Sequence, residues 1–288
     1  MNKCYVSILI LNFNNARFLN RSIKSCLNQS YKNFEILVYD DKSTDESISI
    51  LKKIKNKKIK IFFNKSKKKK IAALDAKNGY YNLIKLSKGK IIFLLDSDDY
   101  FKKDKIKEVL KVYKKNNQVN FVQDLPAKYS EKITEIKDKN NFLSFWPYLT
   151  PESCISFRKK FFIKFKKKNY NIENNFNDVW LGFRLGVFAY FKDKSFYFLK
   201  KNLTIYKSYG ESKRYTLFNY NWFNRRLNSF NYLKKINGDI NKINFNFDYL
   251  ITKCAYKRYT IFIRSQSIYL FLKRAYYYSH NLLRIDSH

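Results

Sequence analysis

Apolar residues occur in short continuous runs along the first hundred positions, and each run is followed by a segment of helical character. Such runs are typical of strands that are covered on both faces of a sheet. They are Val6–Leu11, Phe34–Tyr39, Ile59–Phe63 and Ile91–Leu95. The predicted helices include residues 19–27, 76–86 and 102–115. Because strands and helices alternate, the sequence predicts an α/β fold with a parallel, doubly wound sheet, right-handed crossovers and flanking helices.

A polar segment after the second run carries the signature of a helix start. Ser43 and Glu46 have the spacing of a capping box, in which each side chain bonds the backbone N–H of the other residue. The sequence therefore predicts a helix with Ser43 at its N-cap.

The pattern changes after residue 115, where short strand-like and helix-like pieces mix. From Tyr215 onward the chain is aromatic and basic, and its apolar spacing indicates helices. The apolar face runs through Tyr259, Phe262, Ile263 and Leu270. We therefore predict three parts, which are residues 1–115, residues 116–214 and a mainly helical C-terminal extension at residues 215–288.

Positive charge dominates the composition, with 59 Lys and Arg against 23 Asp and Glu and a net charge of +36. Lys, Asn, Ile, Phe and Tyr are abundant, whereas Gly, Pro and Met are scarce. This bias is typical of compositional drift across a genome. Three explanations of the excess of Lys stay open. The first is drift alone, and the second is drift together with attraction to an anionic membrane surface. Nucleic-acid binding ranks third.

Cysteine and histidine contents restrict the chemistry further. The four cysteines form no CxxC pair, so neither a zinc site nor a disulfide framework is predicted, and a reducing compartment is expected. Only two histidines are present, which excludes a multi-histidine metal centre. No apolar run is long enough to predict a transmembrane helix, and no cleavage site follows the first run. The expected location is cytoplasmic, with peripheral contact to the cytoplasmic face of a membrane.

Acidic residues gather where two of the predicted strands end. Asp40–Asp41 follows the second strand, and Asp96-Ser97-Asp98-Asp99 ends the fourth. The carboxyl ends of parallel strands meet at one edge of a sheet. Asp96 and Asp98 point the same way in an extended chain, and they repel unless a proton or cation lies between them. Such oxygen ligands suit Mg²⁺ or Mn²⁺; the alternative is an N-cap cluster for the following Lys-rich helix.

Three motifs in a fixed order extend this argument. They read VSILILNFNN at 6–15, EILVYDDKSTD at 35–45 and FLLDSDD at 93–99. Together they resemble the family-2 glycosyltransferases of the GT-A fold, over residues 3 to about 110. The resemblance implies an inverting transfer of a sugar from a nucleoside diphosphate donor, most often a UDP-sugar, with Mg²⁺ or Mn²⁺ as cofactor. A glycan or lipid-linked saccharide is the implied acceptor, in bacterial surface polysaccharide synthesis, and no nucleic acid is implied.

The same resemblance assigns donor-binding residues in this chain. Asp41 is expected to meet the base or ribose of the nucleotide, and Asp96 is expected near the ribose. The segment 6–15 is expected to wall the nucleobase, with Leu11 and Asn14 as its donor-binding residues.

The metal and the turn before it are assigned in the same way. Asp98 and Asp99 are expected to hold the metal at the diphosphate. Lys42 stands where the family has Gly, a residue that tolerates positive φ. The turn after Asp41 is therefore a point at which this chain departs from the family.

Two downstream segments resemble the acceptor side of the family. Residues 151–159 look like its acceptor-side strand, and residues 177–185 are similar to its ED-x-x-L-x-x-R-L segment, whose aspartate acts as base. Asn177 replaces the usual Glu, and Asp178 is retained. Transfer requires a carboxylate that takes the proton of the acceptor hydroxyl, and Asp178 is the candidate. Its alternative role is an N-cap for a helix at 179–187, and the two roles can coexist.

A loop at residues 203–212 is similar to the family's loop ending Y-R-x-H-x-x-x-S. Lys207 is expected to face the donor diphosphate, and Tyr209 stands where the family often has a His that binds metal. With these roles the three parts become a nucleotide-sugar-binding half (1–115), an acceptor-binding half (116–214) and a basic aromatic helical extension (215–288).

Two other interpretations stay open. A catalytically silent relative that binds nucleotide sugars is suggested by the departures at Lys42, Asn177 and Tyr209, and hydrolysis of the donor would separate it from an enzyme. A nucleic-acid-binding protein is suggested by the charge and by 27 Phe, 24 Tyr and 3 Trp, which are suited to base stacking. The clustered acids and the lack of a nucleic-acid motif argue against it.

Overall fold

The computed structural model describes most of the chain outside four longer segments. The described residues are 5–66, 69, 71–127, 151–169, 172, 175–206, 220–237, 247–257, 268 and 272. The chain divides into two compact units, and each is described by itself. The first comprises residues 1–135 and 149–210, and the second comprises residues 136–148 and 211–288.

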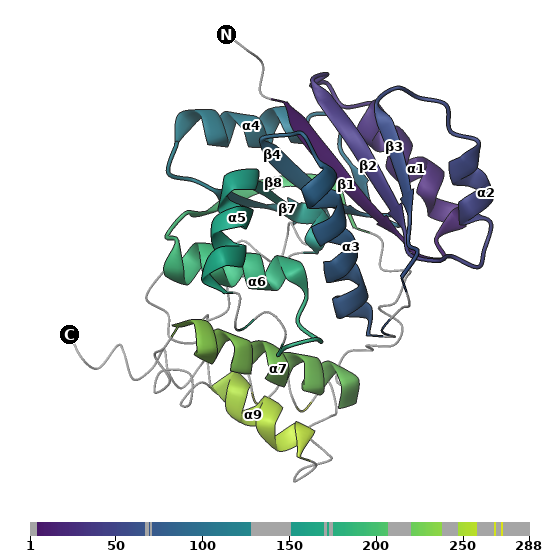
Figure 1. Ribbon diagram of the computed structural model, residues 1–288. Coiled ribbons are helices and arrows are strands. Elements are labelled where there is room, and N and C mark those ends of the chain that lie inside the picture. Colours follow the sequence, from purple (N-terminus) through teal and green to yellow (C-terminus); the bar gives the residue numbers. More distant parts are fainter. Residues whose placement is uncertain are drawn as a thin grey trace. The chain divides into compact units, whose positions relative to one another are not determined.

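Strands and helices alternate through the first hundred residues of the first unit, as the apolar pattern predicts (Figure 1). They are β1 (Val6–Asn12), α1 (Ala16–Leu27), β2 (Phe34–Asp40), α2 (Ser47–Lys52), β3 (Ile59–Phe63), α3 (Ala72–Leu86) and β4 (Ile91–Asp96). The later elements are β5 (Tyr100–Phe101), α4 (Lys105–Lys115), β6 (Phe121–Pro126), the 3₁₀ helix η2 (Glu152–Cys154), β7 (Ile155–Arg158), α5 (Lys159–Lys168), α6 (Leu181–Val187), the π-helical η3 (Phe188–Lys192) and β8 (Phe196–Ile205).

The eight strands in the described part of the chain form one sheet in the order β3-β2-β1-β4-β7-β6-β8-β5. β3, β2, β1 and β4 are parallel, which confirms the doubly wound part of the prediction. β7 is antiparallel to both β4 and β6, and β8 is parallel to β6 but antiparallel to β5. The sheet is therefore parallel over its first half and mixed over its second.

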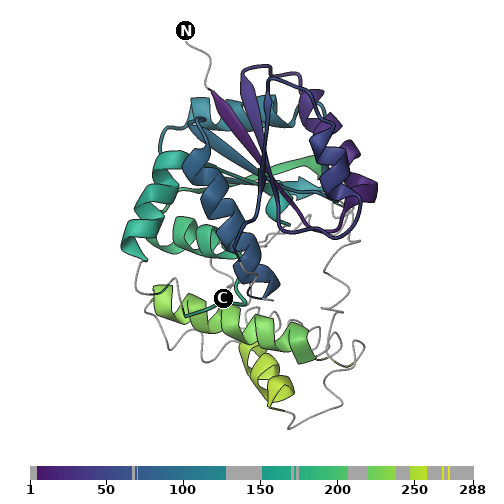
Figure 2. The ribbon, with the colours of Figure 1, turned by 45° about the vertical axis from the view of Figure 1, so that its right-hand side comes forward.

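Two apolar layers cover the sheet because alternate residues of each strand point to opposite faces. Ile8 and Ile10 pack with α1, α2 and α4 on one face, whereas Leu9 packs with α3, α5 and α6 on the other. Figures 1 and 2 show α3 and α1 on opposite sides of the strands. Phenylalanines at 161, 162 and 165 supply the buried side of α5. Both faces of β1, β2 and β4 are thus dry, and the polar chemistry is confined to the strand ends.

The predicted capping box is wrong. The helix begins at Ser47 and not next to Ser43, and no side chain caps it through the Ser43–Glu46 pair. Asp45 instead accepts a hydrogen bond from the Ser47 N–H at 2.9 Å. The Ser43 hydroxyl is buried and bonds to Asp40, so the sequence pattern of a cap is used here to close a turn.

The second unit contains helices α7 (Tyr220–Asn237) and α9 (Phe247–Tyr256), which confirms helical structure in the C-terminal part. Phe223, Ile251 and Ala255 form an apolar cluster between them, and the rings of Tyr220 and Tyr256 stack at 5.2 Å. The predicted apolar face through Tyr259 and Leu270 lies outside the described residues. Among the residues that are described, no helix is both long enough and apolar enough to cross a membrane.

Candidate active site

The parallel register brings three polar residues to one edge of the sheet. Asn12 at the end of β1 pairs with Asp40 at the end of β2, and Leu11 pairs with Asp96 at the end of β4. The backbone of Ser97 then donates to the Leu11 carbonyl at 3.1 Å, so the turn after β4 stays attached to β1. The two acidic groups of the sequence therefore lie at the same edge, as predicted.

Asp40 is the structural member of the Asp40–Asp41 pair. It is fully buried, and it accepts hydrogen bonds from the Asn12 amide at 2.7 Å and from the Ser43 N–H and hydroxyl at 2.9 and 2.7 Å. These contacts close the turn that follows β2. Asp41 is only partly buried, and its carboxylate accepts a 2.6 Å bond from the amide of Asn64, which directly follows β3.

Lys42 occupies the left-handed region that its sequence position suggested. Its φ is +60°, so the turn keeps the backbone conformation that glycine favours although a lysine is present. Asp41 is held next to it by a 2.8 Å bond from its N–H to the Asn12 carbonyl. The turn after Asp41 is therefore left-handed at Lys42 although this residue is not glycine.

Leu11 and Asn14 lie on the β1 side of this edge. Leu11 is partly buried against the core, and Asn14 is exposed with a φ of +51°. The side-chain oxygen of Asn14 accepts a 2.7 Å hydrogen bond from the Thr44 N–H. The backbone N–H of Asn14 donates to the Ser43 hydroxyl at 2.9 Å. Asn14 thus joins the loop after β1 to the loop after β2.

Asp96 and Asp98 form the accessible part of the acidic turn, since both are partly buried. Burial and the negative charge of Asp98 raise the pKa of the Asp96 carboxyl to about 7, although a 3.1 Å hydrogen bond from the Tyr80 hydroxyl opposes the shift. Arg21 on α1 donates a hydrogen bond to the Asp98 carbonyl at 3.1 Å and so ties the acidic turn to this helix. A cation at Asp96 and Asp98 would relieve the repulsion between their charges.

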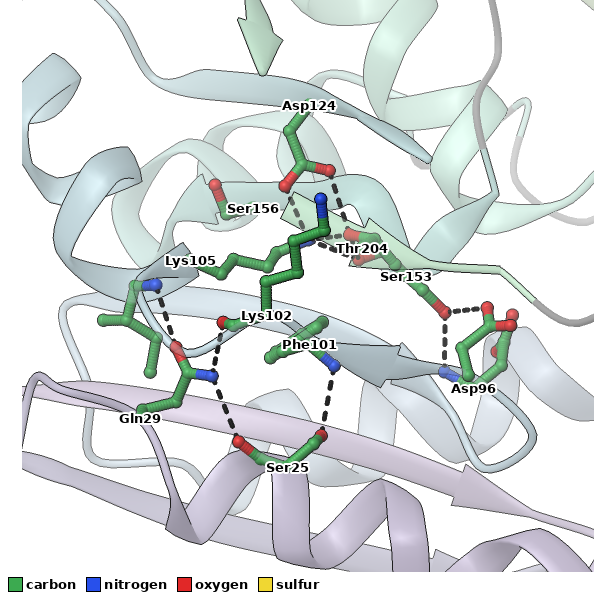
Figure 3. A network of polar contacts seen from close by, with 12 residues as sticks. Ser25, Gln29, Asp96, Phe101, Lys102, Lys105, Asp124, Ser153, Ser156 and Thr204 are labelled. Atoms are coloured by element: carbon green, nitrogen blue, oxygen red, sulfur yellow. Dashed lines mark hydrogen bonds and ion pairs between the residues drawn. The ribbon is translucent and has the colours of Figure 1, made fainter. Parts of the chain in front are cut away.

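Asp99 has a different environment. It is fully buried, and its carboxylate accepts a 2.5 Å hydrogen bond from the Ser153 hydroxyl. The same hydroxyl accepts a 3.0 Å bond from the Asp96 N–H (Figure 3). Ser153 therefore bridges the first and last acids of the turn. The N-cap alternative fails for these acids, because β5 intervenes and the next helix begins only at Lys105.

A buried ion pair supports this bridge from behind (Figure 3). The Lys105 ammonium lies 2.8 Å from the Asp124 carboxylate, and both side chains are 1% exposed or less. Lys105 also donates to the Ser153 carbonyl and to the Thr204 hydroxyl, each at 2.6 Å. Thr204 in turn donates to Asp124 at 3.1 Å. The network joins α4, β6, η2 and β8 directly behind the acidic turn.

Asp178 lies in a turn before α6 and is partly buried. The helix begins at Leu181 with Trp180 at the cap position, so the alternative role of Asp178 as an N-cap is excluded. The turn is held by the fully buried Arg184, whose guanidinium donates to the Val179 carbonyl at 2.9 Å and to the Phe176 carbonyl.

Sequence reasoning missed the residues that hold the site in place. Lys105 and Asp124 stand in none of the motifs. Ser153, Arg184 and Thr204 lie within the segments 151–159, 177–185 and 203–212, but the resemblance gave them no supporting role. The contacts of these residues span up to 99 positions, which no local pattern reveals. Two expectations cannot be followed further, because Lys207 and Tyr209 lie outside the described residues.

The acidic turn fits a divalent cation in the chemistry of its oxygen donors and in the raised pKa of Asp96. Within the described ranges, no cluster of three or more Asp, Glu, His or Cys side chains is arranged to hold a metal by itself. A cation here would therefore take further ligands from substrate phosphate or water, as Mg²⁺ commonly does.

Comparison with known proteins identifies the family. The model of Glycosyl transferase family 2 matches residues 7–198, which include the whole acidic edge and the Asp178 turn. The chain belongs to this family.

Similar proteins agree with this assignment. A segment of 118 residues is 36% identical to the UDP-Glc:alpha-D-GlcNAc-diphosphoundecaprenol beta-1,3-glucosyltransferase WfaP of Escherichia coli, covering 41% of each protein. A segment of 225 residues is 26% identical to a GalNAc(5)-diNAcBac-PP-undecaprenol beta-1,3-glucosyltransferase of Campylobacter jejuni, covering 72% of this chain and 65% of that protein. The matches thus span less than two thirds of either relative.

The fold has a match among solved structures. The mannosyltransferase PcManGT of Pyrobaculum calidifontis, solved with GDP-Man and Mn²⁺, gives a TM-score of 0.59 at 12% identity, covering 95% of this chain and 80% of that one. The predicted α/β fold of the GT-A type is thereby confirmed.

The strained turn leads to a first prediction, that Lys42→Gly stabilises the protein. Glycine adopts a φ of +60° without the steric penalty of a Cβ, and we expect a gain of about 0.5–1 kcal/mol after the greater entropy of the unfolded chain is subtracted. Urea denaturation measures it. Lys53→Gly is the matched control, because Lys53 is exposed at an ordinary φ of −81° and should lose stability. A lower urea midpoint for Lys42→Gly would contradict the assignment of strain.

Proposed function

We propose that the protein is an inverting glycosyltransferase that moves a sugar from a nucleoside diphosphate donor to a hydroxyl of a glycan or lipid-linked acceptor. A UDP-sugar is the donor that we favour. The observation that carries the proposal is the acidic turn Asp96–Asp99, fixed at the carboxyl edge of the sheet beside Asp41. In open α/β sheets, ligands bind beyond this edge. Family membership supports the reaction class.

Donor binding is proposed for the edge formed by β1 and β2. Asp41 is partly exposed and oriented by Asn64, which suits a hydrogen bond to the base or ribose. Leu11 and Asn14 would wall the nucleobase, and Asp96 would lie near the ribose. Lys207 keeps its proposed role at the diphosphate, on the chain that continues from β8.

Asp98 is the leading candidate to hold a divalent cation, with Asp96 beside it. Asp99 keeps a proposed part, although one of its oxygens is already bonded to Ser153. Bound Mg²⁺ or Mn²⁺ would supply positive charge that stabilises the diphosphate as it departs. The protein's own contribution is to hold these carboxylates together, against their mutual repulsion, through Ser153, Tyr80 and Arg21.

Asp178 is proposed as the general base. Its carboxylate would take the proton from the acceptor hydroxyl as the oxygen attacks the anomeric carbon. Asp178 comes from a segment separate from the acidic turn, as an in-line displacement requires. Asp178 does not cap α6. The turn that carries it is held instead by the hydrogen bond from the Arg184 guanidinium to the Val179 carbonyl.

The acceptor and setting are proposed from the two relatives. Both are named as transferases that act on undecaprenol-linked diphosphate saccharides, so a lipid-linked saccharide is the acceptor class that we favour. We propose a role in bacterial surface polysaccharide synthesis, at the cytoplasmic face of a membrane.

Metal dependence is the second prediction. Binding of UDP should collapse in excess EDTA and recover with Mn²⁺ or Mg²⁺, because the diphosphate would otherwise add negative charge to the acidic turn. Asp98→Asn should weaken UDP binding about as much as chelation does. A panel of nucleoside diphosphate sugars, assayed for release of the diphosphate, then identifies the donor and separates an enzyme from a silent relative. Undiminished UDP affinity and turnover in EDTA would remove the metal from the mechanism.

Loss of the base is the third prediction. Asp178→Asn is nearly isosteric, so the fold and the affinity for UDP should stay close to wild type. Turnover should fall by roughly 10²–10⁴-fold, the usual contribution of a general base. Transfer rates with the donor found in the panel, together with thermal unfolding, give both readouts. Near-normal transfer by Asp178→Asn would exclude Asp178 as the base, and Glu152 would be the next described carboxylate on the acceptor side to test.

An anionic membrane surface is proposed as a partner, and the fourth prediction tests it on α5. This helix carries six lysines and no acid, and Ile163 on it is 61% exposed. Lysines near an anionic bilayer contribute about 1 kcal/mol each. Binding to phosphatidylglycerol vesicles should therefore exceed binding to phosphatidylcholine vesicles, and it should weaken with salt.

The vesicle experiment has a matched control on the opposite face of the sheet. Gln in place of four exposed lysines of α5 should reduce binding strongly; these are Lys160, Lys166, Lys167 and Lys168. Gln at four exposed lysines in and after α2 removes the same charge and should have little effect; these are Lys52, Lys53, Lys55 and Lys57. Equal loss in both variants would leave general charge, and hence compositional drift, as the explanation.

A further inference from the structure

The three-residue helix η2 lies between the two places where the proposed chemistry occurs. We propose that Glu152 and Ser153 are positioning residues that together fix the acidic turn relative to the Asp178 turn. This inference rests on the proposed function, and it assigns each of the two adjacent residues to a different half of the site.

Ser153 serves the acidic turn. Its hydroxyl accepts from the Asp96 N–H at 3.0 Å and donates to the Asp99 carboxylate at 2.5 Å, so one side chain fixes both backbone and carboxylate. Both Ser153 and Asp99 are fully buried. Water therefore does not compete for these bonds, and the turn is held tightly.

The backbone of Ser153 is fixed just as firmly. Its carbonyl accepts a hydrogen bond from the Lys105 ammonium at 2.6 Å. A 2.8 Å bond from the Cys154 N–H to the Pro151 carbonyl closes the 3₁₀ turn itself. Because Lys105 is also paired with Asp124, η2 is anchored to the far half of the sheet and cannot shift with the acidic turn alone.

Glu152 points to the other half of the site. Its carboxylate accepts a 2.7 Å hydrogen bond from the Gly182 N–H in the first turn of α6, and the residue is 8% exposed. A Cβ on Gly182 would lie 2.5 Å from Ile155 Cδ1 and 3.2 Å from Glu152 Cγ. The absence of a side chain at Gly182 leaves room for the Ile155 and Glu152 side chains against the first turn of α6.

From α6 the connection returns to the proposed base. Arg184, one turn or less after Gly182, donates to the carbonyls of Phe176 and Val179, and Asp178 lies between these two residues. A continuous path of hydrogen bonds and short covalent segments therefore runs from Asp99 through Ser153 and Glu152 to the Asp178 turn.

The chemistry needs such a path. In an inverting displacement the base and the departing diphosphate act on opposite sides of the anomeric carbon, so their separation must be constant. A misplacement of 1 Å at a reacting group can cost about 10²-fold in rate. Two adjacent residues that each hold one partner set that separation with little backbone between them.

The test compares two variants of the full chain that should each change a different property, with Mn²⁺ and UDP as probes. Ser153→Ala should weaken Mn²⁺-dependent UDP binding by about 10–100-fold, the usual cost of removing a support of a metal site. Glu152→Met keeps the side-chain volume but removes the acceptor. It should leave UDP binding unchanged and should increase amide hydrogen exchange in peptides that cover residues 175–185. Glu152→Gln retains an oxygen for the Gly182 N–H and should restore wild-type exchange.

The outcomes separate the inference from the proposed function. If wild type shows no Mn²⁺-dependent UDP binding, the proposed function fails, and the exchange pattern still tests whether Glu152 holds the Asp178 turn. The inference is overturned if Glu152→Met weakens UDP binding as much as Ser153→Ala does, or if exchange at 175–185 is the same in Glu152→Met and wild type. Where Ser153→Ala does not fold, Ser153→Cys replaces it as the weaker donor.

Discussion

The buried pair of Lys105 and Asp124 is the interaction on which the geometry of the site depends. An ammonium and a carboxylate that are almost fully excluded from water cost several kcal/mol each to desolvate, and only close pairing with further hydrogen bonds offsets this cost. Burial raises the pKa of the Asp124 carboxyl even though Lys105 opposes the shift. The remaining ammonium donors are satisfied by Ser153 and Thr204, so four elements must meet at one point for the pair to exist. The contacts that offset the desolvation cost therefore also hold α4, β6, η2 and β8 together behind the acidic turn.

Charge acts on two length scales in this protein. The sequence carries a net charge of +36, and an excess of positive charge attracts phosphate-bearing ligands and speeds their encounter with a protein. Asp96, Asp98 and Asp99 make a small negative region within this basic chain. Burial and, after it, the negative charge of Asp98 raise the pKa of the Asp96 carboxyl to about 7. Under the proposed function, a diphosphate attracted by the lysines would bind at the turn together with a cation.

Most of the sheet and much of the site edge could be predicted from the sequence. Continuous apolar runs identify buried parallel strands with little ambiguity, and parallel topology by itself brings Asp41 and Asp96 to one edge. The family motifs added residue roles that spacing alone does not give. The capping box failed because Ser43 is also within reach of Asp40 and Asn12, and a local pattern does not reveal which partner wins.

The supporting contacts could not be predicted in this way. Ser153 bonds to residues 54 and 57 positions away, and Thr204 meets Lys105 across 99 positions. These pairings arise from the antiparallel return of β7 beside β4, where the sheet departs from the regular alternation. The start of α6 shows the same limit. Helical spacing suggested position 179, but Val179 closes a turn on Phe176 and the helix begins later, at Leu181.

Some of the few glycines of the chain stand at positions with no space for a side chain. Only six occur in 288 residues, in a sequence that fills most polar positions with lysine or asparagine. A Cβ on Gly89 would lie 2.3 Å from the Ser7 backbone nitrogen, whereas a Cβ on Gly182 would lie 2.5 Å from the end of the Ile155 side chain. At Gly89, one of the scarcest residue types of the chain thus stands where any side chain would collide with the backbone of β1.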